Sequence, residues 1–338
     1  MQQQKMADLP NDRMEPSPPF TYAAVDYFGP WQIKEGRKEM KRYEVLFTCL
    51  VSRAVHIESA ISLTTDSFQN AYRRFVGRRG PVRQLRSDQG TNFVGARTEL
   101  KRALLEMNSN NIRDELLKDQ CDWIEFQMNV PNASHMGGVW ERQIRSVRNV
   151  LDVLLKNHGE QLDDESLRTF LVECDAVVNS RPLTTEGLNA TDSIEPLCPS
   201  NLLTMKSKLA LPPPGLFQRA DTYSRKRWRR VQHLGNEFWK RWKSEFLLAM
   251  QRRTKWTKPR RNLQHGDIVI IKDDVARPNQ WQLARVDEPY LDADGLVRKV
   301  KLKLATSNLD KDGKRKDMVH TYIERPIHKL VLILGSNK

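Results

Sequence analysis

The spacing of apolar and polar residues predicts strands first, and then strands alternating with helices, up to about residue 180. Three strand-like segments come first, at residues 21–30, 42–51 and 54–63, and the third alternates apolar and polar side chains as a half-buried strand does. We expect Gly29-Pro30 to end the first strand and Thr65 to cap the first helix. The other predicted elements are a helix at 65–80, a strand leading into Asp88, a helical region at 92–119, a strand at 122–128, and helices at 139–156 and 163–179.

This order predicts an α/β fold class, a mixed sheet flanked by helices on its faces. Beyond it, residues 183–216 are irregular and contain the stiff run LPPPG. Apolar residues then recur at helical spacing from Trp228 to Met250, and the C-terminal residues predict about five short strands with Asp-Gly turns at 294–295 and 312–313. We therefore expect a flexible leader (1–17), a core (18–190), a linker with an amphipathic helix (191–258) and a small β-barrel (259–334).

The net charge of +14 indicates a polyanionic partner, and most of the excess is local. Residues 219–261 hold 15 Lys or Arg and 3 acids. Such a segment predicts sequence-independent contact with nucleic-acid phosphates, and its apolar stripe predicts packing on a domain; the two roles are compatible. Basic runs such as RKRWRR are also weak nuclear-localisation signals.

The apolar content argues against two other classes of protein. No apolar run is long enough to cross a bilayer, so we expect no membrane contact, and the leader lacks the apolar centre of a signal peptide. The four cysteines are far apart and form no C-x-x-C pair, which favours reduced, buried thiols over a zinc knuckle.

Three acids stand out against this background. Asp26 lies within an apolar strand, where a carboxylate is costly unless a cation meets it. Asp88 ends a predicted strand before Gly90, and Glu141 opens a helix after paired glycines. Taken singly, Asp88 is typical of a turn and Glu141 of an acid that the helix dipole favours.

Taken together, the three acids predict a metal site. Arg145 and Arg148 follow Glu141 on the same helical face, as expected of a site that gathers both metal and phosphate. Three carboxylates repel one another, and two Mg²⁺ (or Mn²⁺) ions would remove that repulsion while leaving positions for phosphate and water. Two such ions support phosphoryl transfer by activating the attacking oxygen and stabilising the leaving one.

The segments VDYFGP, SDQGTNF and GGVWERQIRSVRNVL resemble the three motifs of the DDE integrases of retroviruses and LTR retrotransposons. The chain is most similar to Pao/BEL retrotransposon integrases over about residues 15–334, including PSPPF, VNSRPLT and RPIHKLVLI. The 52 residues between Asp88 and Glu141 are a wider gap than in many integrases and resemble the Pao/BEL pattern.

The resemblance implies an RNase H-like catalytic core in which Asp26, Asp88 and Glu141 bind metal, and a C-terminal SH3-like barrel that binds DNA. It implies 3′-end processing and strand transfer of retrotransposon DNA into target DNA by a homo-oligomer that needs no small-molecule cofactor. We expect the protein in the nucleus, with the cytoplasm as a second location. The residues expected to contact DNA are Thr91, Asn92, Arg145, Arg148, Arg225, Lys226, Arg227, Arg229, Arg230, Lys240 and Arg241.

One departure from the family pattern concerns the N-terminus. Integrases carry a His/His/Cys/Cys zinc domain before the core, and the first 17 residues here hold neither His nor Cys. We therefore expect a fragment, a truncated reading frame or a host-retained remnant. Two alternatives stay open: a domesticated, catalytically silent DNA- or chromatin-binding protein, and an RNA-cleaving nuclease on the same core.

Overall fold

A computed structural model describes residues 14–87, 125–128, 140–183, 196–206, 213, 215–250, 261–272, 278–306 and 319–336. The chain divides into two compact units. Unit 1 consists of Met1–Asn179, Pro199–Lys208 and Pro213–Phe238, and unit 2 consists of Ser180–Cys198, Leu209–Pro212 and Trp239–Lys338. The division falls inside one helix, α8 (Arg227–Met250), which contributes residues to both units.

Unit 1 contains a five-stranded mixed sheet in the order β3-β2-β1-β4-β5. β1 is antiparallel to β2 and parallel to β4, so it is the central strand, while β3 lies at an edge. This sheet confirms the predicted mixed α/β class. The strands are β1 (Tyr22–Glu35), β2 (Lys38–Cys49), β3 (Val55–Ala60), β4 (Gln84–Ser87) and β5 (Glu125–Met128).

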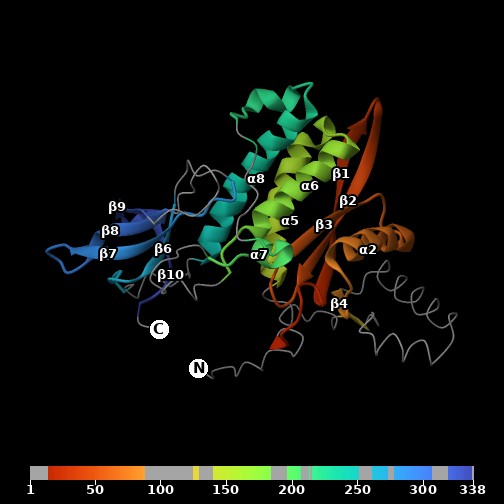
Figure 1. Ribbon diagram of the computed structural model, residues 1–338. Coiled ribbons are helices and arrows are strands. Elements are labelled where there is room, and N and C mark those ends of the chain that lie inside the picture. The colour runs from red at the N-terminus through yellow and green to blue at the C-terminus, as the bar shows by residue number, and fades with distance from the viewer. Residues whose placement is uncertain are drawn as a thin grey trace, which may run out of the picture. The chain divides into compact units, whose positions relative to one another are not determined.

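Helices cover both faces of this sheet. Alternate residues of a strand point to opposite faces, so neighbouring residues of β1 contact different helices. Ala23 and Val25 of β1 belong to a core cluster with Phe68 and Phe75 of α2 (Thr65–Arg79). The next residue, Asp26, faces α5 instead. Figure 1 shows α2 on one side of the sheet and α5 and α6 together on the other. Their bounds are Trp140–His158 for α5 and Asp164–Asn179 for α6, and the 3₁₀ turn η2 (Gly159–Gln161) joins them.

Three local predictions need correction. β1 does not end at Gly29-Pro30 but continues to Glu35, because the ladder with β2 shifts register between Phe28 and Trp31 and then resumes. A bulge of this kind absorbs a turn-like pair inside a long strand. The N-cap of α2 is Thr64 rather than Thr65, since its side chain accepts a hydrogen bond from Ser67 N. The region predicted to be irregular contains a short helix, α7 (Pro199–Thr204).

Unit 2 contains a five-stranded antiparallel sheet in the order β10-β6-β7-β8-β9. The 3₁₀ turn η4 (Ile327–Lys329) joins β9 to β10 along the chain. The predicted Asp294-Gly295 turn is present between β7 and β8, with Gly295 at φ 75°. The other Asp-Gly pair lies outside the described residues. The strands are β6 (Ile268–Ile271), β7 (Leu283–Leu291), β8 (Val297–Thr306), β9 (Val319–Pro326) and β10 (Leu330–Leu334).

The sheet of unit 2 is buried on both faces at β6. Val269 and Ile271 join one apolar cluster, whereas Ile268 and Ile270 join another with Leu247 of α8. The unbroken apolar run of β6 follows from this, since a strand covered on both sides has no polar face. Near α8, the Trp281 ring lies 5.0 Å from Trp239, 6.1 Å from Trp242 and 5.3 Å from Phe246, centroid to centroid.

Two predictions from composition can be compared with the structure. Cys49, Cys174 and Cys198 are buried, as predicted for small apolar residues, and Cys121 lies outside the described residues. Among the helices that the structure describes, none combines the length and apolar content that crossing a membrane requires.

Candidate active site

Asp26 lies on the central strand of the unit 1 sheet, on the face that α5 covers. Its side chain is 26% exposed, and its backbone pairs with Leu46 of β2. The flanking β1 residues from Tyr22 to Val25 are buried, so the strand position is fixed by the core while the carboxylate keeps limited access to solvent. A strand acid with this exposure can bind a cation without being fully desolvated.

Arg148 of α5 provides a cation for this carboxylate. Its Nη1 atom lies 3.0 Å from Asp26 Oδ2, and its guanidinium carbon lies 5.8 Å from the centre of the Phe28 ring. A second bond joins the same two elements, because Trp31 Nε1 donates to Asp152 Oδ1 at 3.0 Å. Two polar bonds thus fix α5 against β1, and the question raised by a strand aspartate is answered in part: Asp26 meets Arg148.

The structure describes where the other two acids attach to the fold, but not their carboxylates. β4 runs parallel to β1 with Val25 opposite Ser87, and Ser87 is the residue before Asp88, which lies outside the described residues. Glu141 is in the first turn of α5, seven residues before Arg148, and its side chain is not described. The strand end before Asp88 therefore lies beside Asp26. A shared pocket of the three carboxylates stays a prediction.

The predicted DNA-binding residues have varied surroundings. Arg145 is exposed on α5, and Thr91 and Asn92 lie outside the described residues. Around the start of α8, Arg225 and Lys226 are exposed, whereas three arginines are engaged within unit 1. Arg227 pairs with Asp163 and Glu165, Arg229 pairs with Asp221, and Arg230 donates to the carbonyls of Gln161 and Ser224. Lys240 is exposed and Arg241 is half-buried on the unit 2 part of α8.

A metal site cannot be assembled from the described side chains alone. Among them, no group of three His, Cys, Asp or Glu residues is placed to hold a metal ion. The one predicted ligand whose side chain is described, Asp26, is a carboxylate, which is the ligand type that Mg²⁺ prefers.

Comparison with known proteins gives a partial match. A family model described as "Family of unknown function (DUF5641)" matches residues 226–333, about a third of the chain, which includes all of α8 and the unit 2 sheet up to Ile333. No curated protein matches the chain. Among solved structures, the chain is similar to one in "CryoEM structure of simian T-cell lymphotropic virus intasome in complex with PP2A regulatory subunit B56 gamma". The identity is 11%, the match covers 99% of this chain and 86% of that chain, and the TM-score is 0.36. At this TM-score the likeness defines neither the fold nor the function of this chain.

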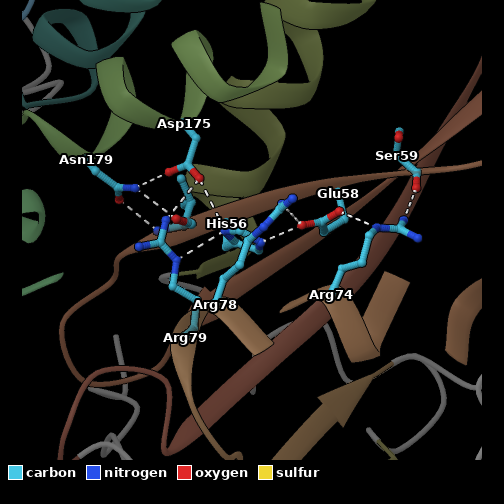
Figure 2. A network of polar contacts seen from close by, with 9 residues as sticks. His56, Glu58, Ser59, Arg74, Arg78, Arg79, Asp175 and Asn179 are labelled. Atoms are coloured by element: carbon cyan, nitrogen blue, oxygen red, sulfur yellow. Dashed lines mark hydrogen bonds and ion pairs between the residues drawn. The ribbon is translucent and has the colours of Figure 1, made fainter. Parts of the chain in front are cut away.

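A second polar cluster in unit 1, which we name the His56 cluster, was not predicted. Figure 2 shows His56 and Glu58 of β3 between the arginines of α2 and Asp175 of α6. His56 Nε2 lies 3.0 Å from Glu58 Oε1, and His56 Nδ1 lies 3.4 Å from Asp175 Oδ2. The members of the cluster are His56, Glu58, Arg74, Arg78, Arg79, Asp175 and Asn179.

The charges of the His56 cluster support one another. Burial by itself lowers the pKa of His56, but the contacts with Asp175 and Glu58 outweigh burial and raise the pKa above its ordinary value. The charge of Arg79, whose Nε lies 3.2 Å from His56 Nδ1, opposes this rise. Burial likewise raises the pKa of Glu58, yet His56 and Arg74 bring its net shift below the ordinary value. His56 and Glu58 thus each favour the charged form of the other.

Two sequence signals could have indicated this cluster. His56 and Glu58 are two residues apart on a strand, so they share a face, and Arg74 and Arg78 are four apart on a helix, so they are neighbours. Nothing in the sequence near His56 indicated that Asp175 of α6 would contact it. Asn179, at the end of α6, also joins this helix to β3, because its side chain exchanges two 2.8 Å hydrogen bonds with the backbone of Val55.

Proposed function

We propose that this chain is a DNA integrase, or a protein derived from one, that carries out metal-dependent 3′-end processing and strand transfer of retrotransposon DNA. One observation supports this most: Asp26 is on the central strand, beside the end of β4 that precedes Asp88, and it contacts α5, the helix whose first turn contains Glu141. The described parts of the three motif segments, which are Asp26 on β1, Ser87 on β4 and the helix α5, lie on neighbouring elements of unit 1 and support the proposal.

The sheets support the finer fold assignment that the proposal includes. In unit 1, an antiparallel β1-β2-β3 ladder continues into parallel β4 and β5, and we propose that this is an RNase H-like core. In unit 2, five short antiparallel strands with a 3₁₀ turn before the last one form what we propose is the SH3-like DNA-binding domain. An apolar centre and a basic helix next to it agree with that role.

The proposed metal ligands are Asp26, Asp88 and Glu141, whose carboxylates are the hard oxygen donors that suit two Mg²⁺ or Mn²⁺ ions. When bound, such ions supply Lewis-acid activation of the attacking oxygen and stabilisation of the leaving oxygen. Arg148 places a positive charge beside Asp26, and Arg145, one turn before it, is exposed. In the proposal these two arginines bind and orient the phosphate, because guanidinium groups match phosphate geometry in a bidentate manner.

The partners of the proposed enzyme are retroelement ends and target DNA, and it works as a homo-oligomer in the nucleus. Arg225 and Lys226, which are exposed, are the residues of the basic segment that we expect to contact phosphates first. Thr91 and Asn92 are proposed to lie next to target DNA.

A strand-transfer assay tests the proposal. Asp26→Asn should lower product formation more than about 100-fold, because a metal ligand contributes several kcal/mol to transition-state stabilisation and about 1.4 kcal/mol is tenfold in rate. Glu39→Gln is the matched control, since Glu39 is an exposed acid on the neighbouring strand β2. The control should join DNA ends as the parent chain does.

The outcomes separate the proposal from its rivals. Full activity of Asp26→Asn would contradict the catalytic proposal. No product from any variant, together with salt-sensitive DNA binding that Asp26→Asn leaves unchanged, would favour the silent DNA-binding protein. Preferred cleavage of an RNA–DNA hybrid over plain duplex DNA would favour the nuclease.

A further inference from the structure

Three arginines line a small pocket at the edge strand of the unit 1 sheet, outside the candidate active site. The pocket has a volume of about 120 Å³, and Arg74 and Arg78 of α2, Glu58 of β3 and Arg168 of α6 line it. The arginine side chains are 42%, 57% and 64% exposed in that order, whereas Glu58 is 5% exposed. The cations are therefore at the mouth and the carboxylate is at the base.

Glu58 holds two of these guanidinium groups in place. Arg74 Nε donates to Glu58 Oε2 at 2.8 Å, and Arg74 Nη2 donates to the Ser59 carbonyl at 2.6 Å. Arg78 Nη1 donates to Glu58 Oε1, and Figure 2 shows both arginines reaching toward Glu58. A buried acid and a backbone carbonyl hold these groups in place. A further ligand would therefore lose less binding free energy to the ordering of the arginine side chains.

The charges of this region are not balanced by its own acids. Around the pocket, the ion-paired cations are Arg42, Arg74, Arg78 and Arg168, and their acids are Glu58 and Asp164, so two positive charges remain. Asp164 does not fully neutralise Arg168, because the same carboxylate also accepts a hydrogen bond from Arg42 Nε at 2.5 Å. Arg78 has one hydrogen bond among the described residues, which leaves its Nε and Nη2 donors available.

We propose that Arg74, Arg78 and Arg168 form a phosphate-binding pocket. Phosphate supplies negative charge that the pocket lacks, and its oxygens suit the planar fork of arginine. The source can be a free phosphate anion or a phosphate of a DNA backbone, which would extend the DNA-binding surface to the β3 edge. Charges on an edge strand also prevent edge-to-edge pairing, but that role requires neither a pocket nor a shared buried acid.

Thermal unfolding in inorganic phosphate, with chloride buffers of equal ionic strength as reference, tests the pocket. The parent chain should unfold at a higher temperature in phosphate, since a ligand that binds only the folded state stabilises it. Arg78→Gln and Arg168→Gln should each weaken phosphate binding about tenfold, the effect of losing a charge-assisted hydrogen bond. Arg73→Gln is the matched control, because Arg73 is exposed on α2 but does not line the pocket.

Arg168→Gln controls for a loss of folding, because no hydrogen bond or ion pair joins Arg168 to the buried Glu58 among the described residues. An equal phosphate effect in the parent chain, the two pocket variants and the control would overturn the proposal. It would also be overturned if phosphate had no effect and the parent chain formed a dimer that both variants lose, since the pocket would then take a carboxylate of a second copy.

DNA binding distinguishes the two phosphate sources. If the pocket holds a backbone phosphate, the slope of log K against log salt for duplex DNA should become shallower by about 0.9 in Arg78→Gln but not in Arg73→Gln. An unchanged slope together with a lost phosphate effect assigns the pocket to a free anion. Neither result depends on strand transfer, so failure of the proposed enzymatic function leaves this inference testable.

Discussion

At the scale of single residues, Glu44 of β2 is a buried acid whose ionisation would be costly. It is 0% exposed, and neither of its carboxylate oxygens has a hydrogen-bond partner. Burial, then the charges of Asp164 and Glu58, raise the pKa of Glu44 well above its ordinary value, although Arg42 opposes the shift. Glu44 is therefore protonated in the folded protein over a pH range in which the unfolded chain ionises it.

The stability contribution of Glu44 has a definite sign. A raised folded-state pKa gives stability that is present below the unfolded pKa and lost as pH rises through the folded value. Glu44→Gln should thus raise the free energy of unfolding at neutral pH by on the order of 1–3 kcal/mol, because the amide is neutral without binding a proton, and each pH unit between the unfolded pKa and the folded value costs about 1.4 kcal/mol.

Chemical denaturation at neutral pH and near pH 4 measures this effect, with exposed Glu39→Gln of the same strand as control. The gain should be larger at neutral pH, because near pH 4 the unfolded chain also holds the proton. A gain of equal size at both pH values would contradict the assignment.

At the scale of elements, two glycines show how closely the parts of unit 1 approach each other. A Cβ on Gly159 of η2 would lie 2.5 Å from the Gln32 carbonyl of β1, whereas a Cβ on Gly77 of α2 would meet nothing within 4 Å. The close approach is held by a backbone hydrogen bond from Lys34 N to Leu162 O of 2.9 Å. η2 thus packs on β1 through backbone, with no room for a side chain.

Alanine substitutions at these two positions should have opposite effects. Gly159→Ala should destabilise the protein by about 1–3 kcal/mol, the typical cost of overpacking. Gly77→Ala should stabilise it by about 0.5–1 kcal/mol, because alanine is the better residue inside a helix. Equilibrium unfolding of both variants measures the two effects, and a neutral Gly159→Ala would contradict the backbone packing.

Elements were predictable from the sequence to the extent that their signals are local. The periodicity of β3 predicted that strand correctly, and the order of the predicted elements predicted the mixed sheet. The continuation of β1 past Gly29-Pro30 was missed because its ladder depends on β2, which accepts the register shift. The His56 cluster was missed because Asp175 meets β3 only through tertiary packing. For the candidate site, the sequence placed Asp26 on a strand, and nothing local indicated that Arg148 would contact it.

At the scale of the whole molecule, the net charge of +14 is distributed unevenly between paired and exposed cations. Arg227 has two acids within 3.2 Å, whereas Arg225 and Lys226 are exposed and make no ion pair within the described part of the chain. A paired cation offers less net charge to a polyanion. The net positive charge that the basic segment offers to a polyanionic partner is therefore smaller than its composition indicates.

DNA binding as a function of salt tests this distinction. Replacing Arg225 and Lys226 together by Gln should make the slope of log K against log salt shallower by up to about 1.8, because each phosphate contact contributes about 0.9. Arg227→Gln, the paired cation of the same segment, should change the slope less than either single replacement. Equal changes for all three residues would show that the ion pairs of Arg227 open on binding.

The two-sided burial of β6 has a consequence for how unit 2 tolerates mutation. All four residues from Ile268 to Ile271 are at most 3% exposed. An ordinary surface strand accepts a hydrophilic replacement at every second position, so a saturation scan across it gives a striped profile. Across β6, the same scan should show that hydrophilic replacements are poorly tolerated at all four positions. We therefore expect no position in β6 at which such replacements are neutral.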